Sequence, residues 1–593
     1  MTDAAAQVEA ARKALAEAEA ALAAEAAAAQ VEPADVTPRA GEATASAPGP
    51  LAEADVLRIQ AGYAFDGPAL EMGALVNGDA RPDVPIRIPL AMMNRHGLVA
   101  GATGTGKTKT LQVLAEQLAA AGVPVFAADI KGDLSGIASA GESSPKLLER
   151  TQGIGQDWSP EATPTEYYTL GGLGTGIPIR ATVSSFGSLL LAKVLGLNDT
   201  QESSLGLVFH YADKAGLPLL DLTDLRAVLS FLTSSEGKAE LKELGGLSSA
   251  TAGVILRELI TFADQGADVF FGEPEIDTSL FLRTAADGRG IVSLLEIPGV
   301  QDKPALFSTF LMWLLADLFN DLPEVGDIDK PKLVFFFDEA HLLFKNASKD
   351  FIESITQTVR LIRSKGVGIV FVTQTPKDVP TDVLSQIGSR VQHQLRAHTP
   401  DDARALKSTV STYPTSGYAL GEVLTSLATG EAIITVMNEK GAPTPVAWTR
   451  LRAPRGSMAP TPHDVMAATV AASPLSAQYG EVVDRESARE ILAVKMNAAA
   501  EADASAVAAV EAEKAAAAAA KAAAANQKAS AKASADMERA KREWEKASSR
   551  PKTTSRTTTR KQPNVIEDVL GSRTGQTVVR EVLRGIFGTL KRR

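Results

Sequence analysis

The chain has 593 residues, of which 45% are hydrophobic, and its 60 Lys and Arg against 71 Asp and Glu give a formal net charge of −11. This length allows several folded units, and the lack of any cysteine excludes disulfide frameworks, thiolate metal sites and cysteine nucleophiles. No stretch reaches the roughly 18 uninterrupted apolar residues of a membrane helix, and the Ala-rich start lacks a signal pattern, so we expect a cytoplasmic protein without an integral membrane segment.

The charge is unevenly distributed. Residues 541–593 hold 14 basic and 5 acidic side chains, which leaves 46 basic and 66 acidic side chains for residues 1–540. An acidic body with a basic tail indicates that an anionic partner would meet the tail or a local lining. A merely solvated tail explains the pattern equally well.

By composition the chain divides into four parts. Residues 1–50 form an Ala-rich arm, helical or disordered, that ends in a Pro-rich linker. In residues 51–455, short apolar runs alternate with longer helical patterns, which predicts an α/β domain with a mostly parallel sheet. A helical insertion is expected at about 185–288. Residues 456–497 indicate a linker with short helices, and residues 498–593 an Ala/Lys-rich helix, a basic linker and an amphipathic end.

Within the α/β domain, the apolar runs place the strands and the 3.6-residue periodicity places the helices. The predicted strands are 97–100, 123–129, 290–296, 333–337, 368–373, 391–395 and 433–437. The predicted helices are 107–121, 305–319, 349–364 and 399–410.

A glycine-rich segment follows the first of these strands and fits the phosphate-loop pattern G-x-x-x-x-G-K-[ST]. It consists of Gly101, Ala102, Thr103, Gly104, Thr105, Gly106, Lys107 and Thr108. Glycines let backbone N–H groups surround phosphates, and the following helix presents its positive end to them. Lys107 would reach the β- and γ-phosphate oxygens of ATP, and Thr108 would ligate Mg²⁺. The alternative, a plain glycine-rich turn, leaves this strand, loop and helix context unexplained.

The apolar strand at 333–337 ends in two carboxylates, Asp338 and Glu339. Asp338 suits a magnesium ligand, and Glu339 suits the general base that orients an attacking water molecule. The alternative is a helix N-cap that follows a core strand.

Other polar residues lie at strand ends. Gln374 follows the strand at 368–373, where it would sense the γ-phosphate or close a turn. Arg363 ends the helix before that strand, as a phosphate contact or a helix cap. Arg95 precedes the loop strand and is a candidate arginine finger for a neighbouring subunit.

A fourth group follows the second predicted strand. It consists of Asp129, Lys131 and Asp133. These residues would position water or metal, or would simply form a turn.

The residues of several strings resemble the HerA-like ATPases of the HerA/FtsK superfamily, particularly a bacterial branch with a HerA-like helicase domain. The strings are RHGLVAGATGTGKTKTLQVLAE, GVPVFAADIKGDLSGIA, LLDLTDLRAVL, KPKLVFFFDEAHLLF, VRLIRSKGVGIVFVTQTPKDVP and RVQHQLRAHTP. The resemblance implies a RecA-like core, a homo-oligomeric and usually hexameric ring with ATP at subunit interfaces, and DNA as a candidate substrate for translocation.

The resemblance also implies roles at the matching positions of this chain. Lys107 and Thr108 match the Walker A lysine and hydroxyl, and Asp338 and Glu339 match the Walker B pair. Gln374 matches the sensor, and Arg363 matches the arginine before the sensor strand. Arg95 matches the arginine that acts in trans by its spacing alone.

Three functional hypotheses follow. The first is a ring-forming, ATP-driven DNA motor. The second is an ATPase or nucleotide switch that remodels a protein complex without DNA. The third is a scaffold that binds ATP without hydrolysing it, which the presence of Glu339 and Gln374 disfavours.

Overall fold

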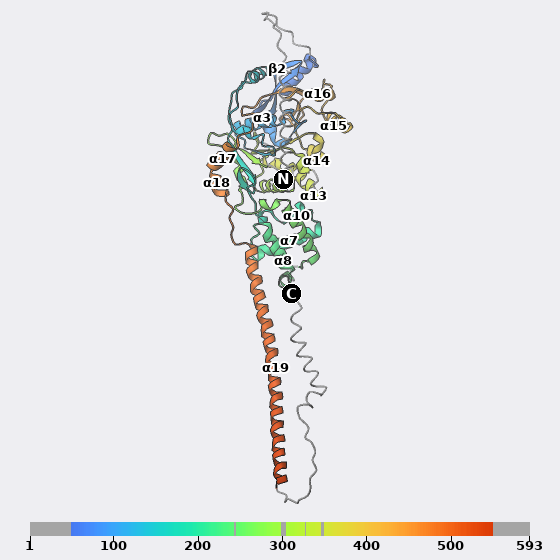
Figure 1. The fold of residues 1–593 in the computed structure, drawn as a ribbon. Coiled ribbons are helices and arrows are strands. Elements are labelled where there is room, and N and C mark those ends of the chain that lie inside the picture. The colour runs from blue at the N-terminus through green and yellow to red at the C-terminus, as the bar shows by residue number, and fades with distance from the viewer. Residues whose placement is uncertain (1–48, 242–244, 298–303, 327, 345–348, 549–593) are drawn as a thin grey trace, which may run out of the picture. The chain divides into compact units, whose positions relative to one another are not determined.

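A computed structural model describes residues 49–241, 245–297, 304–326, 328–344 and 349–548 (Figure 1). The chain forms two units, residues 1–495 and residues 496–593. The expected N-terminal arm, except for its last two residues, and the expected basic linker and amphipathic end lie outside the described residues.

The first unit is built on one sheet of 12 strands in the order β2-β1-β12-β11-β10-β3-β9-β8-β4-β7-β5-β6. Its strands are β1 (Ala69–Asn77), β2 (Asp79–Pro89), β3 (Gly97–Ala100), β4 (Val125–Asp129), β5 (Thr165–Leu170), β6 (Ile177–Ile179), β7 (Val292–Glu296), β8 (Leu333–Phe337), β9 (Val367–Thr373), β10 (Ser389–Gln392), β11 (Glu431–Thr435) and β12 (Ala447–Leu451). The neighbours from β10 to β6 pair in parallel. The strands β11, β12, β1 and β2 extend one edge in antiparallel fashion.

The predicted α/β class with a mostly parallel sheet is confirmed, and all seven predicted strands are present as β3, β4, β7, β8, β9, β10 and β11. The four predicted helices are present as α3 (Lys107–Ala120), α11 (Pro304–Asp321), α13 (Lys349–Ile362) and α15 (Pro400–Val410). Five further strands were not predicted, and all of them lie toward the two lateral edges of the sheet: β1, β2, β5, β6 and β12.

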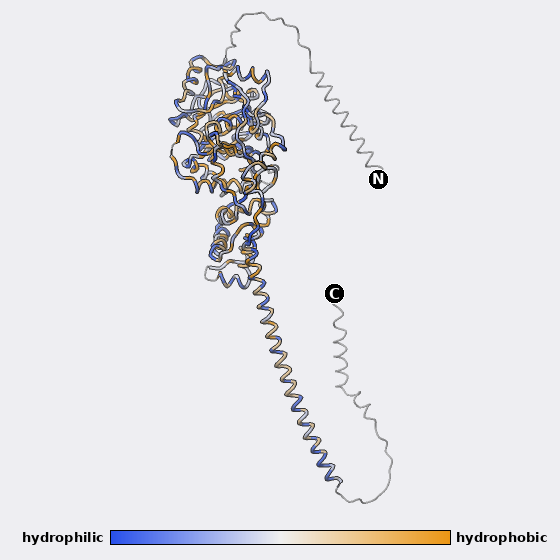
Figure 2. The backbone as a smooth tube through the Cα atoms, turned by 90° about the vertical axis from the view of Figure 1, so that its left-hand side faces the viewer, coloured by the Kyte–Doolittle hydropathy of each residue, from blue (hydrophilic) through white to orange (hydrophobic). Residues whose placement is uncertain are grey.

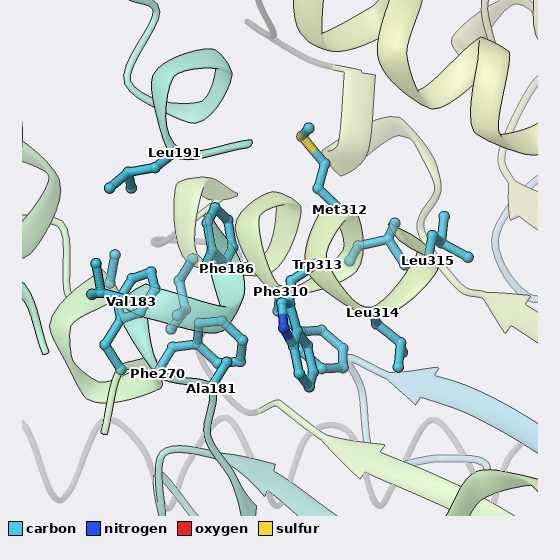
Figure 3. Close-up of a cluster of buried hydrophobic side chains, with 14 of the residues drawn as sticks. Ala181, Val183, Phe186, Leu191, Phe270, Phe310, Met312, Trp313, Leu314 and Leu315 are labelled. Carbon is cyan, nitrogen blue, oxygen red and sulfur yellow. The ribbon is translucent and has the colours of Figure 1, made fainter. Parts of the chain in front are cut away.

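Helices predominate between β6 and β7, where a helical insertion was predicted. They are α5 (Val183–Phe186), α6 (Ser188–Val194), α7 (Asp199–Lys214), α8 (Leu222–Thr233), α9 (Ser235–Glu240) and α10 (Ser249–Asp264), and two 3₁₀ turns follow at Ala267–Phe270 and Thr278–Leu282. Figure 1 shows α7, α8 and α10 gathered together. Figure 3 shows how this region packs on α11: the Phe270 ring lies 5.5 Å from the Trp313 ring and 5.8 Å from the Phe310 ring. The insertion therefore shares the core of the sheet domain.

Hydrophobic cores cover both faces of the sheet. Along β8, Leu333, Phe335 and Phe337 belong to one core, while Val334 and Phe336 belong to the other. This alternation follows from the two-residue period of a strand. A strand that is buried on both faces reads as a continuous apolar run, which explains why the sequence located β8 so sharply.

Shorter helices complete the first unit, and a long helix continues into the second. The shorter ones are α2 (Glu53–Gly62), α4 (Pro145–Gln152), α12 (His341–Phe344), α14 (Thr381–Leu384), α16 (Leu420–Ser426), α17 (His463–Ala472) and α18 (Pro474–Tyr479). The long helix, α19, runs from Ala488 to Ser548, and it becomes more hydrophilic toward Ser548 (Figure 2). Among the described residues, no helix is both long enough and apolar enough to span a bilayer.

Candidate nucleotide-binding and catalytic site

The phosphate loop lies between the end of β3 and the start of α3. Gly104 and Gly106 adopt φ angles of 82° and 108°, in the left-handed region that favours glycine. A Cβ atom at Gly104 would have no other atom within 4 Å, and Thr103 and Gly104 are exposed. The loop is therefore open at its apex, above the first N–H groups of α3, as a polyphosphate requires.

Lys107 lies inside this loop. Its side chain is buried, and its Nζ donates to the carbonyl oxygens of Gly101 at 2.7 Å and Ala102 at 3.2 Å. Burial lowers the pKa of Lys107, whereas the nearby carboxylates of Glu339 and Asp338 raise it. The lysine is thus held by the loop, near the carboxylates of Asp338 and Glu339.

Thr108 contacts an acid from the turn after β4. Its Oγ1 donates to Asp133 Oδ2 at 3.1 Å, and Asp133 Oδ1 is buried without a hydrogen-bond partner. The turn is fixed by Asp129, which accepts from the N–H groups of Gly132 and Leu134, both at 2.8 Å. Asp129 therefore shapes the turn, and Asp133 faces the position where Thr108 would hold a cation.

Three neighbouring strands end in buried carboxylates at the same register. Asp129 pairs with Glu296 across β4 and β7, and Asp338 takes the equivalent position after β8. Burial is the main cause that raises the pKa of Asp338 to about 7 and the pKa of Glu296 to about 8. Buried carboxyl groups of this kind need a proton or a cation nearby. This edge of the sheet is accordingly suited to a metal-bound polyphosphate.

Glu339 is the most constrained acid at this edge. Its φ angle of 47° is rare for a residue other than glycine, and its N–H donates to Asp338 Oδ1 at 2.8 Å. Its Oε1 forms an ion pair with Lys131, and His341 Nδ1 lies 3.2 Å from its Oε2. Burial alone would raise the pKa of Glu339, but Lys131, with the smaller influence of His341 and Lys107, brings it below the ordinary value. The candidate base is therefore ionised and held by a lysine.

Gln374 follows β9, which lies between the loop strand β3 and the Walker B strand β8. It lines a cavity of about 270 Å³ together with Thr103 and Arg396, and another of about 370 Å³ together with His341. Arg396 Nη2 donates to Thr103 O at 3.3 Å. The structure thus brings the loop, Gln374 and Arg396 together around one opening.

The two remaining candidates lie elsewhere. Arg95 precedes β3 and Arg363 precedes β9, so both lie at the amino ends of parallel strands whose carboxyl ends carry the loop and Gln374. With about 3.3 Å per residue, the seven residues of β9 put roughly 20 Å between the two ends. The Arg363 charge instead lies near buried His96, whose pKa falls to about 4, mainly because of burial. Neither arginine is brought to the phosphate loop of its own chain.

The chain matches the family model described as Helicase HerA-like C-terminal over residues 75–593. The chain belongs to this family. It is accordingly a P-loop ATPase, as the loop and the strand-terminal acids had led us to expect.

Individual HerA-like relatives are distant. The DNA double-strand break repair helicase HerA of Saccharolobus solfataricus is 23% identical over 405 residues, which cover 68% of this chain and 71% of that protein. A probable helicase of Methanocaldococcus jannaschii is 23% identical over 363 residues, which cover 58% of this chain and 64% of that one.

Similar solved structures include the plasmid coupling protein TrwB with an ATP analogue and VirB4 of Thermoanaerobacter pseudethanolicus. The TrwB chain has a TM-score of 0.46 at 16% identity, covering 67% of this chain and 98% of its own. The VirB4 chain has a TM-score of 0.42 at 14% identity, and the match covers 65% of this chain and 97% of the VirB4 chain.

The site of this HerA-like chain also contains residues whose role sequence reasoning left open or did not raise. Lys131 and Asp133 had been expected either to position water or metal or to form a turn, and Glu296, Arg396 and His393 had not been singled out. His393 is fully buried, with its Nε2 2.9 Å from Thr110 Oγ1, and a Cβ atom at Gly101 would lie 2.4 Å from the His393 Cβ. Of these residues only Glu296 could have been found from the sequence, because it is an acid at the end of an apolar strand, as Asp338 is.

Proposed function

We propose that this protein hydrolyses ATP with Mg²⁺ and uses the energy to move DNA, as a subunit of a homo-oligomeric, hexameric ring in the cytoplasm. The observation that carries the proposal is the separation of the site residues. The phosphate loop, the acids and Gln374 lie at the carboxyl ends of the parallel strands, whereas Arg95 and Arg363 lie at the amino ends. A ring in which the carboxyl ends of one subunit's strands face the amino ends of the next subunit's strands would complete each site.

The nucleotide would be held by groups already in place. The residues Gly101 to Gly106 and the first N–H groups of α3 would surround the phosphates, and Lys107 would leave its loop carbonyls to contact the β- and γ-oxygens. Bound Mg²⁺ would neutralise charge that develops on those oxygens. Thr108 and Asp338 would hold it, with Asp133 beside them. Among the described residues no three acidic or histidine side chains form a metal site by themselves, which suits a cation held partly by phosphates.

The hydrolytic step would use Glu339 and Gln374. Glu339 would accept a proton from the attacking water molecule, and Gln374 would orient that water against the γ-phosphate. Lys131 keeps the Glu339 carboxylate ionised and in one position. Arg363 or Arg95 of the adjacent subunit would stabilise the charge of the transition state.

DNA is proposed as the substrate because one relative is named a DNA double-strand break repair helicase. The acidic body of the chain opposes general DNA binding, since contacts to the phosphate backbone dominate such affinity. A few cations on a local surface are enough to supply those contacts. The competing function is an ATPase that remodels a protein complex without DNA.

Steady-state ATP hydrolysis by the purified full-length protein, with and without single- and double-stranded DNA, separates these functions. Lys107→Ala and Glu339→Gln serve as site variants, and Lys330→Ala serves as a control, because that lysine bonds to the Ala121 carbonyl away from the site. We expect DNA to stimulate hydrolysis in the wild type and in Lys330→Ala only. Hydrolysis that depends on Glu339 but is unaffected by DNA would favour protein remodelling instead.

A further inference from the structure

The second unit of the chain carries a feature that the ATPase site does not use. Between Lys514 and Ala535, the only charged residues of α19 are four lysines, and all of them are exposed. They are Lys514, Lys521, Lys528 and Lys532. The other residues of this segment are Ala, Ser, Asn and Gln.

The spacing of these lysines aligns them. Their intervals are seven, seven and four residues, and with 3.6 residues per turn all four fall within an arc of about 40°. At 1.5 Å per residue they extend over about 27 Å of the helix. They form one straight row, which we call the lysine stripe.

The rest of this segment limits what the stripe can bind. From Ala512 to Asp536 the helix has no side chain of Val, Leu, Ile, Met or an aromatic residue. It therefore lacks the apolar seam of a coiled coil and the apolar face that inserts a helix into a membrane surface. Scattered lysines would serve solubility equally well, whereas aligned lysines present a continuous row of positive charge.

We propose that the lysine stripe binds the phosphate backbone of double-stranded DNA. This inference rests on the proposed DNA motor and names a contact surface for it. A duplex carries about one negative charge per 1.7 Å of axis, so a row of about 27 Å lies along roughly eight base pairs. Without apolar or aromatic side chains the contact is electrostatic and independent of base sequence.

The test measures binding of full-length protein to a labelled duplex by fluorescence anisotropy at several salt concentrations. In the variant, all four lysines become alanine, which preserves helix propensity. We expect affinity at low salt to fall about tenfold or more, and the slope of log K against log salt to become shallower by about three to four. An unchanged affinity and slope would overturn the proposal.

A second variant keeps the charge and breaks the row. It combines Lys521→Ala with Ala523→Lys and Lys528→Ala with Ser530→Lys, which turns two lysines about 200° around the helix. Duplex binding clearly weaker than that of the wild type would support the proposal. Duplex binding as tight as that of the wild type would show that only net charge matters and would overturn the proposal. Loss of binding to anionic vesicles, with no change in duplex binding, would also overturn it.

The outcome is separable from that of the proposed function. DNA-stimulated hydrolysis is measured on the same proteins at saturating duplex. If stimulation persists while the four-alanine variant binds like the wild type, the motor stands and the stripe fails. If the wild type neither binds duplex nor responds to it, both fail.

Discussion

Lys131 and Glu339 form the ion pair that joins two of the strand ends around the candidate site. Lys131 is partly exposed, whereas Glu339 is almost fully buried, and their ion pair connects the turn after β4 to the end of β8. In the proposed mechanism Glu339 must be ionised to accept a proton. We therefore expect Lys131 to set the pH at which hydrolysis can begin.

Replacing Lys131 tests this role. In Lys131→Ala, the burial of Glu339 is no longer opposed by the ion pair, so the pKa of Glu339 should rise. The acidic limb of the pH dependence of ATP hydrolysis should then move to higher pH, while the basic limb should not change. Lys330→Ala is the matched control. An acidic limb that stays in place would show that Lys131 does not set the ionisation of Glu339.

The sequence predicted the site only as far as its residues are adjacent in the chain. The segment Gly101–Thr108 and the pair Asp338–Glu339 are local patterns, each with its own strand, so they could be assigned from the sequence. Lys131 was foreseen as one of two alternatives, but its ion pair with Glu339 exists only because β4 and β8 are neighbours in the sheet. Glu296 reaches the same strand ends because β7 lies beside β4. Strand order is not encoded in any local pattern, and this is why Glu296 was missed.

At the scale of elements, α3 links the phosphate loop to a second polar region. Its Glu116 carboxylate accepts hydrogen bonds from the backbone N–H groups of Arg455 and Gly456, both at 2.8 Å. Burial is the main cause that raises the pKa of Glu116 from 4.5 to about 7. The helix that begins at the loop is thus fastened to the end of the α/β domain by a carboxyl group that titrates near neutrality.

This carboxyl group predicts a pH dependence of stability. Because the folded pKa is raised above the unfolded value, its contribution is complete below about pH 4.5 and is lost as pH rises through about 7. The loss is on the order of 3 kcal/mol. Compared with Glu116→Gln in thermal unfolding, the wild type should lose stability between pH 5 and pH 8. Parallel curves for the two proteins would contradict the assignment.

The strands that were not predicted from the sequence lie toward the lateral edges of the sheet, where local features disturb the apolar pattern of a strand. The β2 strand holds Pro82 and Pro85 among charged residues, which interrupt the alternation that marks a strand. It lies at the edge of the sheet, where a missing N–H donor is tolerated. The β6 strand has only three residues and follows a glycine-rich turn. Central strands were predicted because burial on both faces makes them apolar throughout.

At the scale of the whole molecule, the candidate site residues lie at opposite ends of the parallel strands. The carboxyl ends hold the phosphate loop and the acidic groups, and the amino ends hold Arg95 and Arg363. In the proposed ring each chain would supply halves of two different sites, and we expect hydrolysis to require assembly. The second unit would add a contact to DNA without taking part in the chemistry.

The most direct test of this shared site mixes two inactive proteins. We expect Lys107→Ala and Arg363→Ala each to lower ATP hydrolysis by about 10³-fold or more, with Arg95→Ala tested in the same way. Arg360→Ala, an exposed arginine one turn earlier in α13, should keep activity. In a randomly mixed ring about one interface in four joins an intact loop to an intact arginine. We expect an equimolar mixture of Lys107→Ala with an arginine variant to recover about a quarter of wild-type hydrolysis. A mixture as inactive as its two components would contradict a site shared between subunits.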